Sequence, residues 1–380
     1  MASNMKKVYI TSLHMMHGGI EMAITLLANA LVKRNYDVEI LCTYNLGTPV
    51  YQLDDKVKIT YLTDVKPNKK EIKEAIRSKN PIAIVKQGLY AAKVLFLKQK
   101  TLEDKIKTIT EGCIVSTRNE HSVILSKYGH KNIKKIAQLH HDHCFDKKLI
   151  KDFRQNYKNI DVFILLTEWL RTEIQEMMKE NTHTKLVVVP NFLPEIEVTT
   201  NIERENQVIA VGRLHEVKGF LRMLDIWATI KTNEAYILKI VGDGEEYDAI
   251  SKKIQELGLE KRVILAGAME HSKVLEEMGK SKVYLMTSYT EAFPFVLIEA
   301  MSKGLPMVAY DVRVGPRAMI DDSQNGYLVE DGNVELFKNK LEHILNDDIQ
   351  CEKMSRNSLA KAACFTEEVV MKQWISILEE

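Results

Sequence analysis

Two carboxylates bracket the start of a predicted helix in the second half of the chain. Glu291 lies just before Pro294, which suits the first helical position, and Glu299 follows about a turn and a half into the helix. The N–H groups that begin a helix, here those of Phe295 and Val296, have no internal partners and attract anions, above all phosphates. Taken alone, the pattern also fits an acid favoured by the helix dipole and a solvated helix glutamate. The motifs around it favour a site in which two carboxylates address different parts of one phosphate-bearing ligand.

Basic residues and glycines follow other predicted strands of the same half. Arg213 follows a strand at 208–211 and Lys218 opens the next helix, so both stand at the carboxyl end of a strand and can clamp a diphosphate. Gly242 follows a strand at 236–241, where a tight turn lets backbone approach a ligand. The sequence contains neither the Gly-x-Gly-x-x-Gly dinucleotide fingerprint nor the Gly-x-x-x-x-Gly-Lys-Ser/Thr phosphate loop. That argues against a dehydrogenase and against an NTPase.

The first half of the chain carries a glycine pair and a histidine cluster. Gly18 and Gly19 follow its first strand, and His140-His141-Asp142-His143 follows a later one. Three readings of the cluster stay open, namely a ligand contact by His140, a polar loop, or a metal site. No Asp-x-Asp occurs in the sequence, so cations at a diphosphate are expected from side chains and helix dipoles rather than from a metal.

The predicted elements that position these residues form two α/β domains, each with a parallel, doubly wound sheet. Strands alternate with helical segments, which predicts right-handed crossovers and parallel sheets. The strands of the first half are expected at 8–13, 37–43, 57–62, 113–117, 136–139 and 161–166, with helices at 20–34, 70–78 and 86–108. The pattern restarts at 208, and the chain ends in two helices after 347. Ligands bind beyond the carboxyl ends of such strands, so the site is expected in a cleft between the two domains.

Prolines at 190 and 194 and the polar stretch after them mark a linker. The expected domains are an N-terminal domain at 1–190, a linker at 191–206, a C-terminal domain at 207–365, and a final helix at 366–380 that packs back on the first domain.

Composition points to a globular protein kept inside the cell. The chain has 380 residues, of which 45% are apolar and 28% charged, and this length favours two domains. Its five cysteines are scattered without a Cys-x-x-Cys pair, which fits a reducing cytoplasm. No apolar run approaches the ~18 residues of a membrane span, and no signal peptide is recognisable.

A net charge of +1 conceals a basic block at 66–158, which holds 22 Lys and Arg against 9 Asp and Glu. The block has few aromatics and no nucleic-acid-binding motif, so nucleic acid is not expected as a partner. An anionic lipid surface or a phosphate-bearing acceptor fits better, with a solvated face as the plain alternative. The helices at 70–108 mix lysines with apolar residues such as Leu89 and Phe96, as helices on a membrane surface do.

Together these motifs resemble those of glycosyltransferase family 4, the retaining, nucleotide-sugar-dependent enzymes with the GT-B fold, of the type that builds bacterial surface glycans. The matching residues are Gly18-Gly19-Ile20-Glu21, Val211-Gly212-Arg213-Leu214, Lys218-Gly219, Val241-Gly242-Asp243-Gly244 and Glu291-x7-Glu299 with Ala300-Met301. The similarity covers most of the chain and is strongest at 208–329. Where many members have glycines around the phenylalanine, this chain has Ala292 and Pro294.

The resemblance implies specific roles. Arg213 and Lys218 would bind the donor diphosphate, Glu299 the ribose hydroxyls, Glu291 the donor sugar, and the N–H groups of Phe295 and Val296 the distal phosphate. His140 would contact the donor sugar and is placed, with Glu291, Arg213 and Lys218, among the catalytic residues. The implied donor-binding set is Gly18, Gly19, Arg213, Lys218, Gly242, Met269, Glu291, Phe295, Val296 and Glu299.

The activity so implied is transfer of a hexose or N-acetylhexosamine, without a metal cofactor, from a UDP-sugar to a surface glycan, teichoic acid, glycolipid or glycoprotein. The leaving phosphate would take the acceptor proton, and Glu291 would position the sugar. The enzyme would be cytoplasmic and touch the inner face of the membrane through 66–158. Two alternatives stay open, a GT-B-type nucleotide-sugar epimerase and a non-catalytic binder of nucleotide sugars or lipid headgroups.

Overall fold

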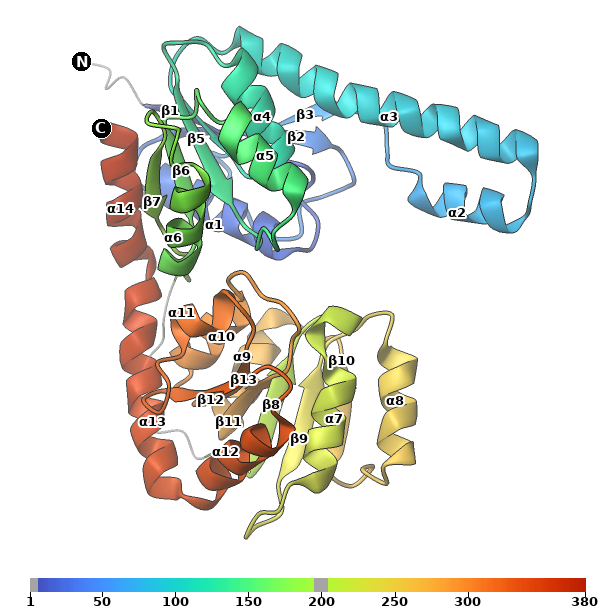
Figure 1. The fold of residues 1–380 in the computed structure, drawn as a ribbon, viewed down its shortest axis with the longest axis vertical. Coiled ribbons are helices and arrows are strands. Elements are labelled where there is room, and N and C mark those ends of the chain that lie inside the picture. The colour runs from blue at the N-terminus through green and yellow to red at the C-terminus, as the bar shows by residue number, and fades with distance from the viewer. Residues whose placement is uncertain (1–5, 195–203) are drawn as a thin grey trace. The chain divides into compact units, whose positions relative to one another are not determined.

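The computed structural model describes residues 6–194 and 204–380, so most of the predicted linker at 191–206 lies outside the described residues. The chain divides into two compact units, each built on its own parallel sheet (Figure 1). The N-terminal unit contains the residues up to Leu165, Arg171–Val189 and Trp374–Glu380, and the C-terminal unit contains Leu166–Leu170 and Pro190–Gln373.

The N-terminal sheet has seven parallel strands in the order β3-β2-β1-β4-β5-β6-β7. Its strands are β1 (Lys7–Ser12), β2 (Asp37–Tyr44), β3 (Lys58–Thr63), β4 (Cys113–Ser116), β5 (Lys134–Leu139), β6 (Val162–Leu165) and β7 (Lys185–Val188). Its helices are α1 (Gly19–Val32), α2 (Lys69–Arg77), α3 (Pro81–Thr108), α4 (Asn119–Tyr128), α5 (Lys147–Asn156) and α6 (Glu168–Met177). Central strands such as β1 and β4 are buried on both faces, as expected where crossover helices cover a parallel sheet. The sequence did not predict β7, because this edge strand is short and only partly buried.

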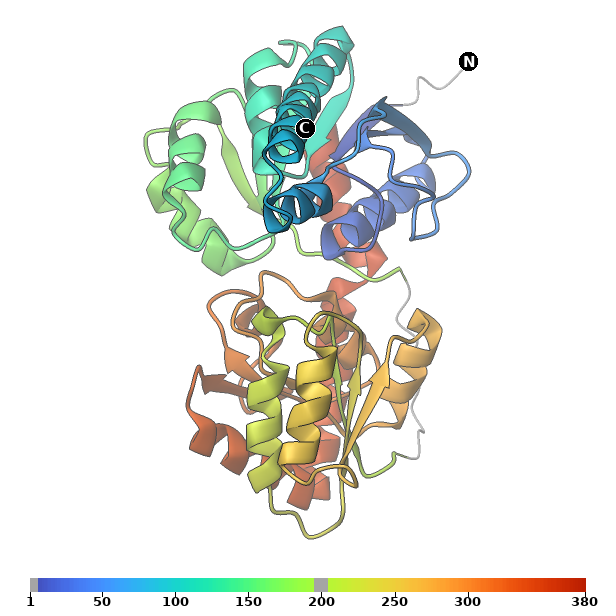
Figure 2. The ribbon, with the colours of Figure 1, turned by 90° about the vertical axis from the view of Figure 1, so that its right-hand side faces the viewer.

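The C-terminal sheet has six parallel strands in the order β10-β9-β8-β11-β12-β13. Its strands are β8 (Gln207–Val211), β9 (Ile237–Val241), β10 (Val263–Gly267), β11 (Val283–Met286), β12 (Met307–Asp311) and β13 (Gly326–Glu330). Its helices are η1 (Glu216–Lys218), α7 (Phe220–Thr229), α8 (Tyr247–Glu256), α9 (His271–Lys280), α10 (Phe295–Ser302), α11 (Gly315–Met319), α12 (Val334–Asn346) and α13 (Asp348–Ala362). Helices α7 and α8 pack together on one side of the sheet, as Figure 2 shows, while α10 packs against α9 and α13. Trp227 of α7 and Phe337 of α12 are fully buried in the core.

The last helix, α14 (Glu367–Glu379), follows the short η2 (Ala363–Phe365). Its end belongs to the N-terminal unit, where Trp374 is buried and Glu380 pairs with Lys185 at 2.7 Å. The N–H of Leu193 donates to the carbonyl of Phe365, and the N–H of Glu367 donates back to the carbonyl of Leu193, both at 3.0 Å. The chain therefore finishes on the unit in which it began.

The turn from η1 into α7 depends on Gly219, which has a left-handed φ of 64°. A Cβ at this position would lie 2.2 Å from the carbonyl oxygen of Thr287, just after β11. The hydroxyl of Thr287 donates to the carbonyl of Gly219 at 2.8 Å, and the N–H of Tyr289 donates to Val217 at 2.8 Å. Only glycine fits where the segments after β8 and β11 meet.

We predict that Gly219→Ala destabilises the protein much more than Gly258→Ala. Gly258 has the same φ of 64° but open space where a Cβ would point, so its substitution carries only the left-handed strain of ~1–2 kcal/mol. Gly219→Ala adds a collision with backbone that costs a further ~1–3 kcal/mol. Thermal unfolding of both variants measures the difference, and equal melting temperatures would contradict the tight contact at Thr287.

Candidate active site

The strand order of the C-terminal sheet reverses between β8 and β11, its two central strands. In open parallel sheets, ligands bind at such a reversal, outside the carboxyl ends of the strands. Arg213 and Lys218 come from the segment after β8, whereas Glu291 and Glu299 come from the segment after β11. The fold thus brings these four predicted residues to one edge of the sheet.

Lys218 and Glu291 form an ion pair across the reversal. The Nζ of Lys218 lies 2.6 Å from Oε1 of Glu291, and the hydroxyl of Ser288 donates to the same oxygen at 2.7 Å. The Glu291 side chain is only 9% exposed, and these two partners compensate the cost of burying a carboxylate. Its main chain is also held, because the N–H of Gly315 donates to its carbonyl at 2.9 Å. Glu291 therefore has a fixed position at the sheet edge.

Arg213 differs from Lys218 because its side chain is exposed and makes no hydrogen bond or ion pair with any residue that the structure describes. The main chain around it is ordered by the N–H of His215, which donates to the carbonyl of Arg213 at 2.8 Å. The guanidinium thus has all of its donors available for an anionic ligand.

Gly242, predicted to let backbone approach a ligand, lies against the backbone of the neighbouring turn. Its φ is 148°, and a Cβ would lie 1.9 Å from the carbonyl oxygen of Gly212. The N–H of Gly212 donates to Val241 at 3.0 Å, and that of Leu214 donates to Asp243 at 2.9 Å. The turns after β8 and β9 therefore support each other and orient the segment that carries Arg213.

Glu299 has a hydrogen-bond partner, His271, that the sequence did not predict. Its Oε1 lies 2.9 Å from Nε2 of His271, the first residue of α9, and its side chain is 8% exposed. The hydrogen bond to this carboxylate raises the pKa of His271. The only sequence signal was the place of His271, four residues after the β10 strand. Met269, also predicted to bind the donor, lies in the same short segment and is partly exposed.

Tyr284 lies within the electrostatic influence of both carboxylates. This fully buried phenol on β11 donates to the carbonyl of Val211 at 3.0 Å. Burial raises its pKa, and the charges of Glu291 and Glu299 raise it further. Tyr284 remains neutral beneath the site and fixes β11 to β8.

The helix that opens beside this site, α10, begins at Phe295 after an extended Pro294. The N–H of Leu297 donates to the carbonyl of Pro294 at 3.0 Å, so the N–H groups of Phe295 and Val296 precede the first intrahelical donor. The predicted helix at 294–303 is found within one residue at each end. Its partial positive charge faces the segment that carries Glu291.

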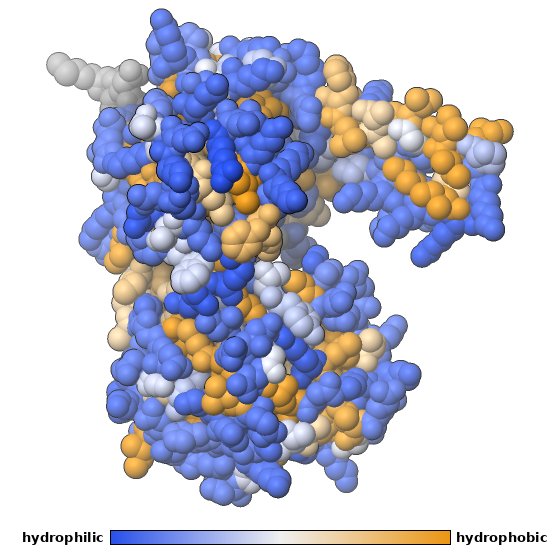
Figure 3. All heavy atoms as spheres, viewed as in Figure 1, coloured by the Kyte–Doolittle hydropathy of each residue, from blue (hydrophilic) through white to orange (hydrophobic). Residues whose placement is uncertain are grey.

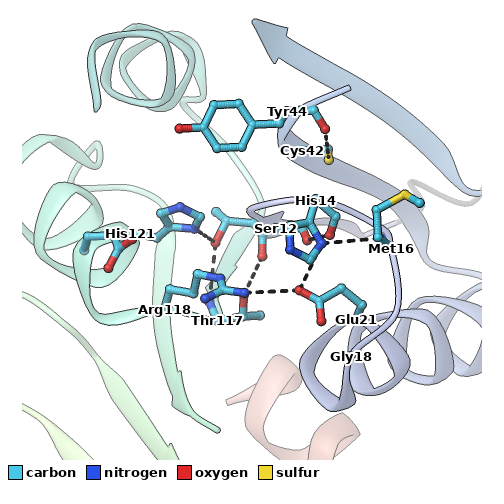
Figure 4. A network of polar contacts seen from close by, with 12 residues as sticks. Ser12, His14, Met16, Gly18, Glu21, Cys42, Tyr44, Thr117, Arg118 and His121 are labelled. Atoms are coloured by element: carbon cyan, nitrogen blue, oxygen red, sulfur yellow. Dashed lines mark hydrogen bonds and ion pairs between the residues drawn. The ribbon is translucent and has the colours of Figure 1, made fainter. Parts of the chain in front are cut away.

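In the N-terminal unit, Gly18 and Gly19 begin α1 beside a network of polar contacts around the buried carboxylate of Glu21 (Figure 4). Glu21 is 3% exposed and pairs with Nη2 of Arg118 at 3.1 Å and with Nδ1 of His14 at 3.5 Å. The sequence reading quoted Glu21 only as part of a motif. No local pattern predicts Arg118, which comes from the segment between β4 and α4.

Two histidines of the cluster after β5, His143 and His140, differ in their hydrogen bonding. His143 is buried, its Nε2 lies 3.0 Å from Glu173, and its Nδ1 accepts the N–H of Phe145 at 3.0 Å. Nε2 of His140 is buried and meets no hydrogen-bonding group among the described residues. Burial lowers the pKa of His140 to about 3, so the ring is neutral at physiological pH. A buried, unsatisfied imidazole nitrogen can bind a hydroxyl group of a ligand.

Within the part of the chain that the structure describes, no three His, Cys, Asp or Glu side chains are arranged to hold a metal ion. The sequence reading had left a metal among the three roles of the histidine cluster. His143 and Asp142 each have a partner within the chain, since His143 lies 3.0 Å from Glu173 and Asp142 accepts the N–H of Cys144 at 3.1 Å.

Comparisons with known proteins agree with this architecture. Residues 193–361 match the family described as glycosyl transferases group 1. The amylovoran biosynthesis glycosyltransferase AmsD of Erwinia amylovora is 28% identical over 95% of this chain and 96% of its own. An α-1,4-N-acetyl-D-galactosaminyltransferase of Campylobacter jejuni, which acts on a diNAcBac-PP-undecaprenol-linked glycan, is 28% identical over 96% of this chain and 95% of its own. The structure of S. aureus TarM, solved with UDP, fondaparinux and α-GlcNAc-glycerol, has a TM-score of 0.78 at 17% identity and covers 99% of this chain and 100% of TarM.

Two parallel Rossmann-like sheets with these structural neighbours define the GT-B fold, as the sequence predicted. The protein is a glycosyltransferase, and its residues 193–361 are similar to the glycosyl transferases group 1 family. The family number and the roles of individual residues stay predictions.

We predict that the His271–Glu299 pair makes stability depend on pH. Because the folded-state pKa of His271 is raised, the stabilisation is fully present below the unfolded-state pKa of about 6.5 and is lost as the pH rises through the folded-state value. Melting temperatures above pH 6.5 should therefore decline more steeply for the wild type than for His271→Gln. Glu299→Gln should flatten the decline equally, and parallel curves for wild type and His271→Gln would show that the pair contributes nothing.

Proposed function

We propose that this glycosyltransferase moves a hexose or N-acetylhexosamine from a UDP-sugar to a cell-surface glycan, teichoic acid, glycolipid or glycoprotein, with retention of anomeric configuration. The observation that carries the proposal is the set of charges at the strand-order reversal. Exposed Arg213, paired Lys218 and Glu291, and buried Glu299 lie beside the start of α10. A nucleoside diphosphate sugar needs this combination of cations, N–H donors and hydroxyl acceptors.

The donor is assigned to the C-terminal unit. Arg213 and Lys218 bind the diphosphate, the N–H groups of Phe295 and Val296 bind the distal phosphate, and Glu299 accepts the ribose hydroxyls. Its pairing with His271 leaves Oε2 of Glu299 to meet a hydroxyl. The solved relative with UDP bound shares this fold and so supports a UDP-sugar, while Gly242 and Met269 complete the edge of the site.

Charge on the leaving diphosphate governs the rate of glycosyl transfer, because the sugar centre becomes oxocarbenium-like as that bond breaks. Arg213 and Lys218 stabilise this charge. Glu291 is already bonded to Lys218 and Ser288, so it orients sugar hydroxyls rather than accepting a proton. The leaving phosphate takes the acceptor proton, which gives retention without an enzymatic nucleophile. Neutral His140 contributes a hydrogen bond to the donor sugar.

The acceptor is assigned to the N-terminal unit, and Gly18 and Gly19, at the start of α1 in that unit, are assigned to donor binding. The Campylobacter relative, named for a polyprenyl-diphosphate-linked acceptor, supports a lipid-linked or surface-glycan acceptor here. Such an acceptor would place the enzyme in the cytoplasm at the inner face of the membrane, with the basic block at 66–158 in peripheral contact. Nucleic acid has no part in this proposal.

We predict that Arg213→Ala lowers turnover by ~100-fold or more without changing the melting temperature. The guanidinium stabilises developing negative charge but has no partner among the described residues, so its loss leaves nothing unsatisfied. Lys218→Ala should lose as much activity and also lower the melting temperature, because Glu291 loses its buried counter-ion. UDP release from several UDP-sugars with lipid-linked and wall-polymer acceptors measures the rate.

Lys231→Ala, an exposed lysine of the same unit, serves as the control and should retain activity. Near wild-type turnover in both site variants would overturn the donor assignment. A new sugar isomer formed without any acceptor would indicate an epimerase instead.

We predict that the enzyme works without a divalent metal, because side chains and the start of α10 supply the positive charge at the diphosphate. Turnover should be unchanged after dialysis against EDTA. A loss of activity that Mg²⁺ or Mn²⁺ restores would instead assign the cluster around His140 to a metal-dependent role.

A further inference from the structure

Helices α2 and α3 form an arm that extends from the rest of the N-terminal unit (Figure 1). The second half of α3 is rooted in the unit, where Leu102 and Ile106 are fully buried and Lys105 pairs with Glu39 at 3.2 Å. The first half of α3 and all of α2 lie outside the core. Hydrophobic residues gather over this arm in the space-filling view of Figure 3.

The arm is an ordered element. The side chain of Asn80 accepts the N–H groups of Ile82 and Ala83, and Pro81 occupies the first turn, so α3 has a capped start. Helix α2 is tied to α3 because the side-chain amide of Asn68 donates to Gln87 at its carbonyl, 3.0 Å, and its side chain, 2.8 Å. Such an arm can present a fixed surface.

That surface is an apolar stripe along one face of α3. It consists of Ile82, Val85, Leu89, Ala92 and Phe96, spaced alternately three and four residues apart. Side chains at this spacing share one helix face, and the stripe runs for ~21 Å along the axis. Ile82 is 80% exposed, Leu89 69% and Phe96 63%. A face of this size left in water indicates a partner.

The spacing equals that of a coiled coil, so a second copy of the chain is one candidate for that partner. The charges oppose it. Lys86, Lys93 and Lys100 repeat every seven residues beside the stripe, whereas Gly88 and Leu95 flank its other side. Two antiparallel copies would set lysine against lysine, and two parallel copies would set lysine against glycine or leucine. Neither arrangement supplies a counter-charge.

An anionic bilayer complements both features. Apolar side chains enter the boundary between headgroups and acyl chains, while flanking lysines reach lipid phosphates. Lys86 and Lys93 are exposed and have no acidic partner among residues 6–194 and 204–380. Over the same residues, no helix is long and apolar enough to cross a membrane, so α3 would lie in the surface.

We infer that the arm anchors this enzyme to anionic membrane by inserting the α3 stripe between the lipid headgroups, with Lys86 and Lys93 bound to lipid phosphates. The inference deepens the proposed membrane contact and in that respect rests on the proposed function. It narrows the contact from the whole basic block at 66–158 to one face of one helix.

Flotation of the full-length protein with phosphatidylcholine vesicles, with and without phosphatidylglycerol, tests the inference. The wild type should float with the anionic vesicles and release at high salt. Ile82→Ser/Leu89→Ser/Phe96→Ser should weaken binding by ~10-fold or more, because the apolar contact is lost. The control Ile264→Ser/Val334→Ser/Ile349→Ser removes three exposed apolar side chains of the C-terminal unit, which are 46%, 45% and 83% exposed, and should bind like the wild type.

Lys86→Gln/Lys93→Gln should weaken binding and reduce its salt dependence, whereas the exposed pair Lys231→Gln/Lys353→Gln should leave both unchanged. Equal binding by the stripe variant and the wild type would overturn the inference. So would a wild-type dimer, measured by sedimentation, that the stripe substitutions convert to a monomer.

UDP binding and turnover, measured on the same samples, separate this inference from the proposed function. Vesicle binding without UDP-sugar turnover would overturn the function and leave the anchor standing. Turnover without preference for anionic vesicles would overturn the anchor and leave the function standing. UDP affinity should be the same in wild type and stripe variant, which also confirms that the variant is folded.

Discussion

The ion pair between Lys218 and Glu291 joins the two segments that leave the sheet where its strand order reverses. A carboxylate this well buried is tolerated only with compensating partners, and Lys218 and Ser288 both bond the same oxygen. Lys218 can reach it because Gly219 turns in a left-handed conformation directly against Thr287. The pair, the turn and the path of the chain into α10 therefore depend on one another, and the remaining groups of the site take their positions from them.

The two cations of the proposed donor site differ in kind. Lys218 is neutralised by Glu291 before any ligand arrives, whereas Arg213 has no partner among the described residues. Under the proposed function, the diphosphate binds the guanidinium of Arg213, which pairs with no described residue, and also binds Lys218, which is already paired with Glu291. An ordered acid–base pair costs little reorganisation when charge develops on a leaving group. This arrangement fits a reaction whose barrier depends on stabilising departing phosphate.

The net charge of residues 66–158 does not describe the surface of the arm formed by α2 and α3. The sequence shows a basic block of 93 residues, from 66 to 158, and this count does not distinguish solubility from a binding face. Some of these basic residues pair with carboxylates of the same unit, for example Lys105 with Glu39 and Lys98 with Glu120. What remains beside the α3 stripe is a short row of lysines. The apolar residues, which the net charge does not reveal, define the surface.

The sequence by itself determined the parallel α/β architecture, the strands at 208–211 and 236–241 and the helix at 294–303, because apolar periodicity, glycine turns and proline positions act over a few neighbouring residues. It did not predict β12 and β13, the last two strands of the second sheet. It also singled out Arg213, Lys218, Glu291 and Glu299 through motifs that sit at strand ends. It did not reveal His271 beside Glu299, Arg118 beside Glu21, or the internal partners of His143, because these contacts join residues 28, 97 and 30 positions apart. Two further properties depend on which groups the tertiary structure places around a side chain. Burial leaves His140 neutral, with a ring nitrogen that has no partner among the described residues, whereas the α3 stripe remains exposed to water.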